Sequence, residues 1–425
     1  MSPVPEDPTE RFRTNGWWEG STLWDLFSRD AERAPESLAL ADAPNRAEFA
    51  PGPPARWTYA QTRERADRLA AALAAEGVGA IISPLPIQFR AHELRLTGAL
   101  VEPVAAIATT SAAGVDLVEL LASVRGELPS IRAVLALSDE PREGTRSLAR
   151  ILEAPADTAG LDERTAATSA SDVLTICWTS GTEAEPKGVP RSHDLWTAIA
   201  YATTDGADLL EGDTLLTPFP IVNMSGIGGM LVPWLQTGGT LVLHQPMSLP
   251  VFLRQITAER VNYTVAPPVL LNLLLADPST LASVDLAGLR TIGSGSAPLA
   301  PAMVQGWKEQ HGIEVVNFFG SNEGVALVGG PADIPDPTER ARVFPRFGAG
   351  TRTWSNRVAR GLQTKLVDPQ TGEPVTELGR PGELLIEGPT VFAGYWRRPD
   401  LTEAAFDDEG FYRTGDLFLL EDEEH

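Results

Sequence analysis

The chain has 425 residues but only one cysteine, Cys177. A single thiol excludes an intramolecular disulfide, and it excludes a metal cluster built from thiolate ligands. Such low cysteine usage fits a reducing compartment, so we expect a cytoplasmic protein.

Positive charge is also scarce. Lys and Arg total 34 against 57 Asp and Glu, which gives a formal net charge of −23 at pH 7. This charge repels nucleic acids and anionic membrane surfaces at long range, so neither is an expected partner. A site for an anionic ligand has to be locally basic or neutralised by a metal ion. Lys187 and Arg191, which stand next to a glycine-rich turn, are the cations that fit this requirement.

Long apolar segments are missing as well. The polar segment Met1–Gly20 contains no basic stretch followed by an apolar one, as a secretory signal requires. The apolar run Ile221–Leu235 is interrupted by Asn223, three glycines and Pro233, so it falls short of the roughly 18 residues that cross a bilayer. We therefore expect neither secretion nor a membrane span.

What the chain does contain is an alternation of helix-like and strand-like segments. A helical pattern from Tyr59 to Glu76 is followed by a strand-like run from Val104 to Ala108. Further short strands are predicted at Thr214–Thr217, Gly239–His244, Tyr263–Ala266, Arg290–Ile292 and Glu314–Phe318. This pattern predicts an α/β fold, with residues 1–345 forming paired, layered α/β subdomains with mixed, largely parallel sheets.

The pattern changes after about residue 345. A strand at Gln363–Val367, a turn at Asp368–Gly372 and a strand at Gly382–Glu387 indicate a small β-rich subdomain over residues 346–425.

The most informative segment follows a predicted buried strand, Ser171–Trp178, and precedes a predicted helix, Asp194–Thr203. It reads Thr-Ser-Gly-Thr-Glu-Ala-Glu-Pro-Lys-Gly-Val from Thr179 to Val189. Small hydroxyl residues and glycine expose backbone N–H groups that can surround phosphate oxygens, and a lysine adds charge. A Walker A loop is excluded because Pro186 and Gly188 stand where it needs glycine and a hydroxyl residue. Taken alone, the segment is also compatible with a structural turn.

Further motifs follow in a fixed order. They are Gly293–Leu299 (GSGSAPL), Asn317–Glu323 (NFFGSNE), Gly382–Gly388 (GELLIEG), Gly394–Trp396 (GYW) and Tyr412–Asp416 (YRTGD). Together with the Thr179–Val189 segment, they resemble the adenylate-forming superfamily of the acyl-CoA synthetase (acid-CoA ligase) type, from Thr179 to Asp416. Each motif alone is also compatible with an ordinary turn, and a lone Glu323 with a solvated surface residue.

The resemblance implies a site for ATP and Mg²⁺. In this reading Lys187 and Asn322 act on the phosphates, Glu323 holds Mg²⁺, Asn317 recognises the adenine amino group, Phe319 stacks on adenine and Asp416 binds the ribose hydroxyls. The implied nucleotide site further includes Thr179, Ser180, Gly181, Thr182, Gly295, Ser296, Ala297, Phe318, Gly320 and Ser321.

The chain departs from the family pattern at several positions. Glu183 and Ala184 replace threonine and glycine in the phosphate segment, and a carboxylate there disfavours a triphosphate unless it points outward. Phe319 lacks a tyrosine hydroxyl, and Asn322 replaces a threonine. The junction Val78–Gly79 lacks the strand and helix that the family places there, which predicts a lost sheet element.

The resemblance also implies the chemistry. A carboxylic acid attacks ATP to give acyl-AMP and pyrophosphate, and CoA then forms a thioester. A small mobile C-terminal domain serves the second step in the family, and the sequence stops at His425 before that domain, so we expect ATP and acid binding without efficient thioester formation. Loading of a carrier protein and non-catalytic nucleotide binding remain alternative hypotheses.

The substrate and the histidines complete the interpretation. The resemblance places Asn223, Gly228, Gly229, Gly293 and Gly320 around the acid. Small residues leave volume, and no cation stands ready for a second carboxylate, so a bulky apolar acid is expected: alicyclic, polycyclic (terpenoid) or aromatic. An anionic nucleophile needs no general base, and His193, His244 and His311 are expected at surfaces or capping local structure.

Overall fold

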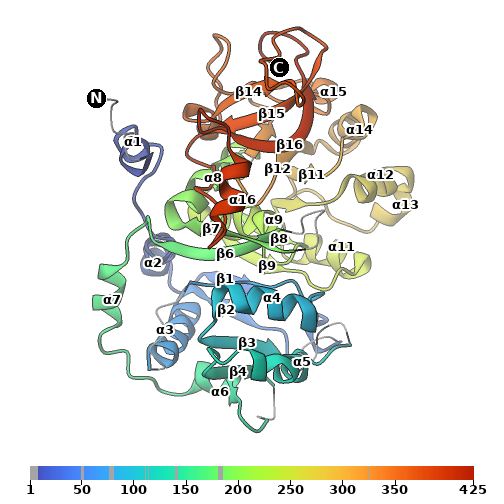
Figure 1. The fold of residues 1–425 in the computed structure, drawn as a ribbon. Coiled ribbons are helices and arrows are strands. Elements are labelled where there is room, and N and C mark those ends of the chain that lie inside the picture. The colour runs from blue at the N-terminus through green and yellow to red at the C-terminus, as the bar shows by residue number, and fades with distance from the viewer. Residues whose placement is uncertain are drawn as a thin grey trace.

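The computed structural model describes residues 8–48, 52–75, 81–110, 112, 114–138, 142–179, 185–324 and 326–425. It is built from α/β layers, which confirms the predicted fold class (Figure 1). No helix in these ranges is both long and apolar enough to cross a membrane.

An eight-stranded sheet forms the centre of the molecule, in the order β13-β12-β11-β10-β8-β9-β1-β2. Strands β1, β8, β9, β10, β11 and β12 run parallel, whereas β2 and β13 pair antiparallel at the two edges. The bounds are β1 Leu38–Ala41, β2 Arg56–Thr58, β8 Thr214–Thr217, β9 Thr240–Leu243, β10 Tyr263–Val265, β11 Thr291–Gly295, β12 Glu314–Gly320 and β13 Ala326–Gly329. The five strands predicted between Thr214 and Phe318 all form within this sheet.

Helices cover both faces of this sheet, as its largely parallel strands require. One core joins the sheet to α2 (Leu23–Arg33), α8 (His193–Gly206), α10 (Val232–Thr237) and the strands of the C-terminal sheet. The second core lies against α11 (Leu249–Ala258), α12 (Pro268–Ala276), α13 (Pro278–Leu281) and α14 (Pro301–His311). The central strands are therefore buried on both sides, which leaves their ends as the accessible positions.

The segment before α8 differs from the prediction. Instead of a turn leading directly into the helix, β6 (Val173–Thr179) and β7 (Lys187–Ser192) form an antiparallel hairpin in which Thr179 pairs with Lys187. The end of the predicted phosphate segment, Lys187–Val189, is therefore part of a strand.

A smaller layer lies at the bottom of Figure 1. Strands β3, β4 and β5 form a parallel sheet; α5 and α6 contact it, α4 packs on α5, and α3 contacts both α6 and α7. The bounds are α3 Tyr59–Ala75, α4 Ala91–Val101, β3 Ala105–Thr109, α5 Leu117–Val124, β4 Ala133–Leu137, β5 Arg146–Ser147, α6 Leu148–Glu153 and α7 Leu161–Ala167.

The junction Val78–Gly79, where the sequence predicts a lost strand and helix, lies outside the described residues. Just beyond it, Ile82 forms a single parallel bridge to Thr175 of β6, and α4 follows. Both elements follow the junction, so the expectation of a lost sheet element stays a prediction.

The C-terminal sheet, drawn at the top of Figure 1, is antiparallel in the order β14-β15-β16. Its strands are β14 (Gln363–Val367), β15 (Pro381–Glu387) and β16 (Tyr412–Leu419), and α16 (Pro399–Ala405) precedes β16. Short elements complete the chain: α1 Pro8–Thr14, η1 Arg46–Glu48, η2 Arg125–Glu127, α9 Met224–Gly226, η3 Ile227–Leu231, α15 Pro337–Arg340 and η4 Arg357–Arg360.

Arg340 provides a test of which contacts stabilise the N-terminal end of β12. Its side chain is fully buried, donates to the Val315 and Ile334 carbonyls at 2.9 Å and pairs with Glu314. Arg340→Met leaves these acceptors without a donor, so we expect the free energy of unfolding to fall by about 3 kcal/mol in denaturant titrations. The matched control is Arg342→Met, because Arg342 is exposed and its ion pair is with the exposed Glu421, and its effect should stay within about 0.5 kcal/mol. Equal effects of the two changes would contradict a structural role for Arg340.

Candidate functional site

The predicted adenine-side motifs meet at the carboxyl ends of two neighbouring strands. Strands β11 and β12 are parallel, and Ser294 pairs with Asn317 while Gly295 pairs with Phe318. In open α/β sheets this edge is where ligands bind. The structure therefore brings Gly295–Ala297 next to Asn317–Ser321, although the two motifs are distant in the sequence.

Close backbone approach explains the glycine in the first motif. A Cβ at Gly295 would lie 2.2 Å from the carbonyl oxygen of Phe318, so no other residue fits without moving β12. Ser296 follows with φ +65, an uncommon conformation for a residue with a side chain, and both Ser296 and Ala297 are exposed. The turn thus presents accessible backbone at the sheet edge.

The two residues assigned to adenine are held in different ways. Asn317 is buried, and its amide nitrogen donates to the carbonyl oxygens of Arg340 at 3.1 Å and Ala341 at 3.4 Å. No donor among the described residues reaches its amide oxygen, so that atom is free to accept. Phe319 packs edge-on against Phe418 of β16, with ring centroids 4.9 Å apart.

Glu323 is not a solvated surface residue. It is buried, and the hydroxyl of Tyr395 donates to its Oε1 at 3.0 Å. The Nζ of Lys187 lies 5.4 Å from the centroid of the Tyr395 ring, and Lys187 forms no salt bridge among the described residues. Tyr395 therefore links the candidate metal ligand to the candidate phosphate-binding lysine.

The Asn322 side chain is engaged by other protein segments. Its amide oxygen accepts from the Met224 backbone N–H at 2.9 Å, and its amide nitrogen donates to the Trp178 carbonyl at 3.1 Å. The side chain thus connects the turn before Glu323 to α9 and to β6. This geometry favours a positioning role over the direct phosphate contact that the resemblance implies.

Arg191 is hydrogen-bonded to the same turn. Its guanidinium is fully buried and donates to the Asn322 carbonyl at 2.6 and 3.0 Å and to the Thr390 carbonyl at 3.4 Å. Burial lowers the pKa of Arg191 to about 10, although the nearby Glu323 carboxylate opposes this shift. The sequence singled out Arg191 as a candidate for anion binding, whereas the structure uses it to hold the backbone that carries Glu323.

Asp416 lies on β16, immediately after Gly415, whose φ of +75 accompanies an irregularity in the pairing with β15. Asp416 is exposed, and it shares one face of β16 with Phe418, the ring that packs on Phe319. Burial raises the pKa of Tyr412, and the charges of Glu323 and Asp416 both add to this shift. The two carboxylates therefore lie within electrostatic reach of the same phenol.

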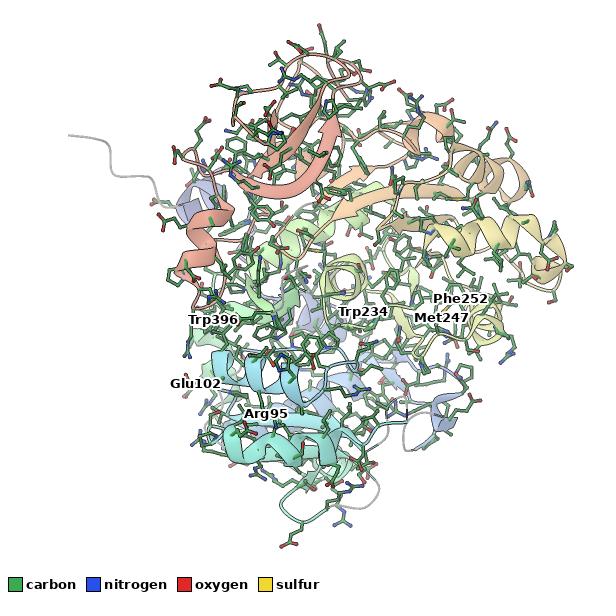
Figure 2. All side chains as sticks on the ribbon, turned by 45° about the vertical axis from the view of Figure 1, so that its right-hand side comes forward. Arg95, Glu102, Trp234, Met247, Phe252 and Trp396 are labelled. Carbon is green, nitrogen blue, oxygen red and sulfur yellow. The ribbon has the colours of Figure 1, made fainter. Side chains whose placement is uncertain are left out.

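Part of the predicted phosphate segment, Ser180–Thr182 with the departures Glu183 and Ala184, lies outside the described residues. Its two ends are described: Thr179 ends β6, and Lys187, its partner, begins β7. After the hairpin, the Gly188 carbonyl accepts from the Trp396 backbone N–H at 2.8 Å. Arg397 pairs with Glu102, the residue that follows α4, and Figure 2 shows Glu102 near Trp396.

The space beside two of the residues predicted to line the acid site is smaller than expected. A Cβ at Gly293 would lie 2.5 Å from the Tyr263 hydroxyl, and a Cβ at Gly228 would lie 2.9 Å from the Met224 sulfur. Neighbouring side chains therefore fill the space that these glycines leave, so the inference of a large cavity from small residues is wrong at these two positions.

The other lining residues are less confined. A Cβ at Gly229 would meet only the Met224 carbonyl and the Thr203 hydroxyl, at 3.9 and 4.0 Å. Asn223 caps α9 by accepting from the Gly226 N–H at 3.3 Å, and Gly320 is exposed at the end of β12.

Two of the histidines, His193 and His244, accept hydrogen bonds at the N-terminal ends of helices. His193 and His244 are buried, contrary to a surface location, and they accept backbone N–H groups from Leu23 and Ser248 at 3.1 and 3.0 Å. Burial lowers the pKa of both imidazoles. They therefore cap local structure, which agrees with the second of the two expected roles, and they need not act as bases.

No group of three or more His, Cys, Asp or Glu side chains suited to a metal occurs among the described residues. A single buried carboxylate such as Glu323 is still compatible with Mg²⁺, which binds one or two protein carboxylates together with substrate phosphates.

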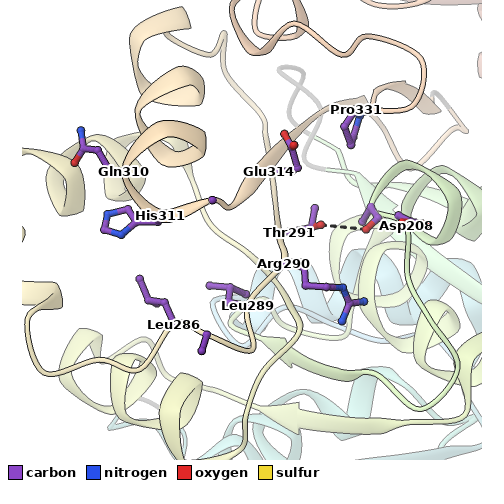
Figure 3. A pocket seen from close by; sticks show the side chains of 12 residues that line it. Asp208, Leu286, Leu289, Arg290, Thr291, Gln310, His311, Glu314 and Pro331 are labelled. Atoms are coloured by element: carbon purple, nitrogen blue, oxygen red, sulfur yellow. Dashed lines mark hydrogen bonds between the residues drawn. The ribbon is translucent and has the colours of Figure 1, made fainter.

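A separate cavity of about 700 Å³ lies at the opposite ends of β11 and β12 (Figure 3). Three of its polar side chains have protein partners: Arg290 pairs with Asp213, Glu314 pairs with Arg340, and the Thr291 hydroxyl donates to the Ala207 carbonyl at 3.1 Å. None of the motif residues lies in its lining, so this cavity is not the candidate site.

Two residues of the site were not assigned from the sequence. Tyr395 stands inside the GYW motif, but its bond to Glu323 joins residues far apart in the chain. Tyr412 belongs to the YRTGD motif, of which only Asp416 was assigned. The motifs themselves were the available signal for both residues.

Comparison with known proteins identifies related sequences. The protein-family model described as "AMP-binding enzyme" matches residues 74–396. An indoleacetate–CoA ligase of Aromatoleum aromaticum is 28% identical over 385 residues, which cover 85% of this chain and 70% of the relative. A probable CoA ligase, CCL5, of Humulus lupulus is 27% identical over 255 residues, covering 59% of this chain and 44% of the relative.

A similar fold occurs among solved structures. The apo structure of MbtA from Mycobacterium smegmatis matches with a TM-score of 0.78 and 23% identity, covering 98% of this chain and 76% of that chain. At this identity the match supports the fold alone. Two of the curated matches show that the chain spans about half of the relatives' length, 44% and 48%.

Arg191 gives a test of how the Glu323 turn is positioned. Arg191→Met removes the donor to the Asn322 and Thr390 carbonyls, so amide hydrogen exchange in Ser321–Gly324 should accelerate at least about tenfold. Global stability should change less, because the substitution also removes a desolvated charge. The control is Arg397→Met, an exposed arginine paired with Glu102, which should leave exchange in this turn unchanged. Unchanged exchange in the Arg191 variant would show that the turn is held by other contacts.

Proposed function

Because the chain belongs to the AMP-binding enzyme family, we propose that it activates a carboxylic acid with ATP to form an acyl-adenylate. The observation that carries this proposal is the contact chain from Lys187 through Tyr395 to Glu323. Strand β12 carries Asn317 and Phe319, and Phe319 packs on Phe418 of β16, the strand that carries Asp416. In this proposal Lys187 is the cation for the phosphates, Glu323 is the carboxylate for the metal ion, and Phe319 is the aromatic ring beside adenine.

The reaction transfers the adenylyl group. A carboxylate oxygen of the acid bonds to the α-phosphorus of ATP, the bond to the bridging oxygen breaks, and pyrophosphate leaves with both electrons of that bond. Such a reaction needs mainly positioning and charge stabilisation. The nucleophile is already anionic, so no general base is required. This agrees with the structural roles of His193 and His244 as hydrogen-bond acceptors.

The residues divide this work as follows. Lys187, with no salt bridge among the described residues, is proposed to contact the phosphates together with Thr179 and the segment Ser180–Thr182. Glu323 would hold Mg²⁺, which supplies neutralisation of phosphate charge when bound. Asn322 keeps Glu323 in place through its bonds to Trp178 and Met224.

The nucleoside part of ATP is proposed to lie across the ends of β11, β12 and β16. The free amide oxygen of Asn317 can accept from the adenine amino group, and Phe319 offers a ring face or edge. The exposed Asp416 has two oxygens for the two ribose hydroxyls. The turn Gly295–Ala297 would border the base.

The acid is proposed to be an apolar, ring-bearing carboxylic acid, and the aromatic class is favoured over the alicyclic and polycyclic ones. Two observations support this choice. Bulky side chains, Tyr263, Phe318 and Met224, fill the space beside the predicted lining glycines. A relative that covers most of this chain is named for an aromatic acid, indoleacetate. CoA is the proposed acceptor for the subsequent thioester.

Glu323 is the residue whose replacement tests the adenylation site directly. Glu323→Gln keeps the shape but removes the charge that would hold Mg²⁺, so acid-dependent ATP–pyrophosphate exchange should fall about 10²- to 10³-fold. The control Glu377→Gln changes an exposed carboxylate and should leave exchange unaltered. Native-level exchange in the Glu323 variant would refute its assigned role.

Asp416 tests the ribose assignment separately. Asp416→Ala removes two charge-assisted hydrogen bonds, and the apparent KM for ATP should rise about 10- to 100-fold in the same assay. The KM for the acid should change little, because the acid lies elsewhere. Asp408→Ala, an exposed aspartate on the loop before β16, is the control. A larger effect on the acid than on ATP would contradict the assignment.

A further inference from the structure

Tyr395 is fixed in place by contacts that do not involve its hydroxyl. Its backbone N–H donates to the Thr402 hydroxyl of α16 at 2.9 Å, and the preceding Gly394 has φ +148, which a residue with a side chain rarely adopts. The ring packs edge-on against Phe392, with ring centroids 4.8 Å apart. The surrounding fold therefore determines where the phenol lies, and its hydroxyl is placed at Glu323.

The segment before Tyr395 is also joined to the backbone that carries Glu323. The Phe392 N–H donates to the Glu323 carbonyl at 2.9 Å, and the Thr390 hydroxyl donates to the Gly324 carbonyl at 3.0 Å. A Cβ at Gly324 would lie 2.1 Å from the Thr390 carbonyl oxygen, so the two segments are in direct contact. Loss of the Tyr395 hydroxyl alone should therefore leave this pairing intact.

The two oxygens of the Glu323 carboxylate differ in their contacts. Oε1 accepts from the Tyr395 hydroxyl at 3.0 Å. Oε2 has no hydrogen-bond partner among the described residues, and it is not one of the fully buried polar atoms that lack a partner. Burial and the charge of Glu323 raise the pKa of Tyr395, so the phenol keeps its proton and remains a donor. The protein thus engages one oxygen and leaves the other free to bind a ligand.

Mg²⁺ and Ca²⁺ use carboxylates differently. Mg²⁺ requires nearly octahedral geometry at about 2.0 to 2.1 Å, whereas Ca²⁺ takes about six to eight oxygens and often both oxygens of one carboxylate. A carboxylate with one oxygen held by a hydrogen bond therefore suits Mg²⁺ better. Hydrogen bonds to a ligating carboxylate also orient it, and their loss typically lowers metal affinity by about 10- to 100-fold.

We propose that Tyr395 is a positioning residue for the metal ion: its hydroxyl holds Oε1 of Glu323, so that the carboxylate offers the ion Oε2 alone and selects Mg²⁺ over Ca²⁺. This inference rests on the proposed function through the Mg²⁺–ATP site at Glu323. It does not depend on which acid is activated. Tyr395 acts through Glu323 and contacts neither the ion nor the substrates.

The test measures nucleotide binding rather than turnover. Isothermal titration calorimetry of the full chain uses α,β-methylene-ATP, which lacks the bridging oxygen that leaves in adenylation, and gives its Kd with Mg²⁺, with Ca²⁺ and with EDTA. The native protein should bind this nucleotide at least about tenfold more tightly with Mg²⁺ than with Ca²⁺. Equal affinities with the two ions overturn the proposal before any variant is made.

Tyr395→Phe removes the hydroxyl and keeps the ring beside Lys187. The released carboxylate can turn or bind with both oxygens, so we expect the Kd with Mg²⁺ to rise about 10- to 100-fold while the Kd with Ca²⁺ stays within about threefold. The matched control is Tyr201→Phe, because Tyr201 is also a buried tyrosine whose hydroxyl donates to a glutamate, Glu19, outside the proposed site. The control should leave both Kd values unchanged.

The outcomes separate the two levels of the argument. If nucleotide binding by the native protein does not depend on the metal ion, the metal role of Glu323 fails and that of Tyr395 with it. If Tyr395→Phe changes both Kd values by the same factor, or neither, only the role of Tyr395 is overturned. A selective loss with Mg²⁺, at a melting temperature close to that of the native protein, supports the proposal.

The proposed reaction is checked separately, by acid-dependent ATP–pyrophosphate exchange in the native protein. Absence of exchange with every acid contradicts adenylation, whereas the ratio of the Mg²⁺ and Ca²⁺ affinities still decides the role of Tyr395.

Discussion

The buried guanidinium of Arg191 is the contact on which the geometry of the site depends. It has no carboxylate in hydrogen-bond contact among the described residues and instead donates to the Asn322 and Thr390 carbonyls. In a low-dielectric interior, moving either acceptor away would leave a buried charge unsatisfied, so the arrangement is strongly fixed. Asn322 adds bonds to β6 and α9. Three segments therefore place the single turn that presents Glu323, and a small displacement in any of them would move the carboxylate.

The charge distribution is compatible with the triphosphate binding proposed for so acidic a chain. The formal charge of −23 acts at long range, but salt screens it beyond about 8 Å. At contact distance, the nearby charges decide. Lys187 stands over the Tyr395 ring with no described salt bridge, and that ring accepts the cation through its face while its hydroxyl serves Glu323. One aromatic side chain thus keeps a cation and an anion close without letting them neutralise each other directly, which leaves both available to a phosphate and its metal ion.

The sequence predicted the central strands well because buried parallel strands appear as short apolar runs between glycine and polar residues. It missed β7 because Lys187–Ser192 contains Pro190 and two charged residues, and its strand conformation depends on pairing with β6. The role of Asn322 could not be predicted either. Its partners, Trp178 and Met224, are far away in the chain, so only the fold shows that both ends of the amide are engaged. Motifs supplied the candidate residues of the site, while the contacts between motifs required the structure.

The lining glycines show why residue size alone misjudges a cavity. A glycine lacks a Cβ, but because protein interiors are closely packed, a neighbouring side chain usually fills the space. At Gly228 that neighbour is the Met224 sulfur, and at Gly293 it is the Tyr263 hydroxyl with the Phe318 ring. A glycine in such a lining therefore allows a particular larger side chain to pack next to it. At Gly293 the position that first indicated volume is therefore filled by a fully buried side chain.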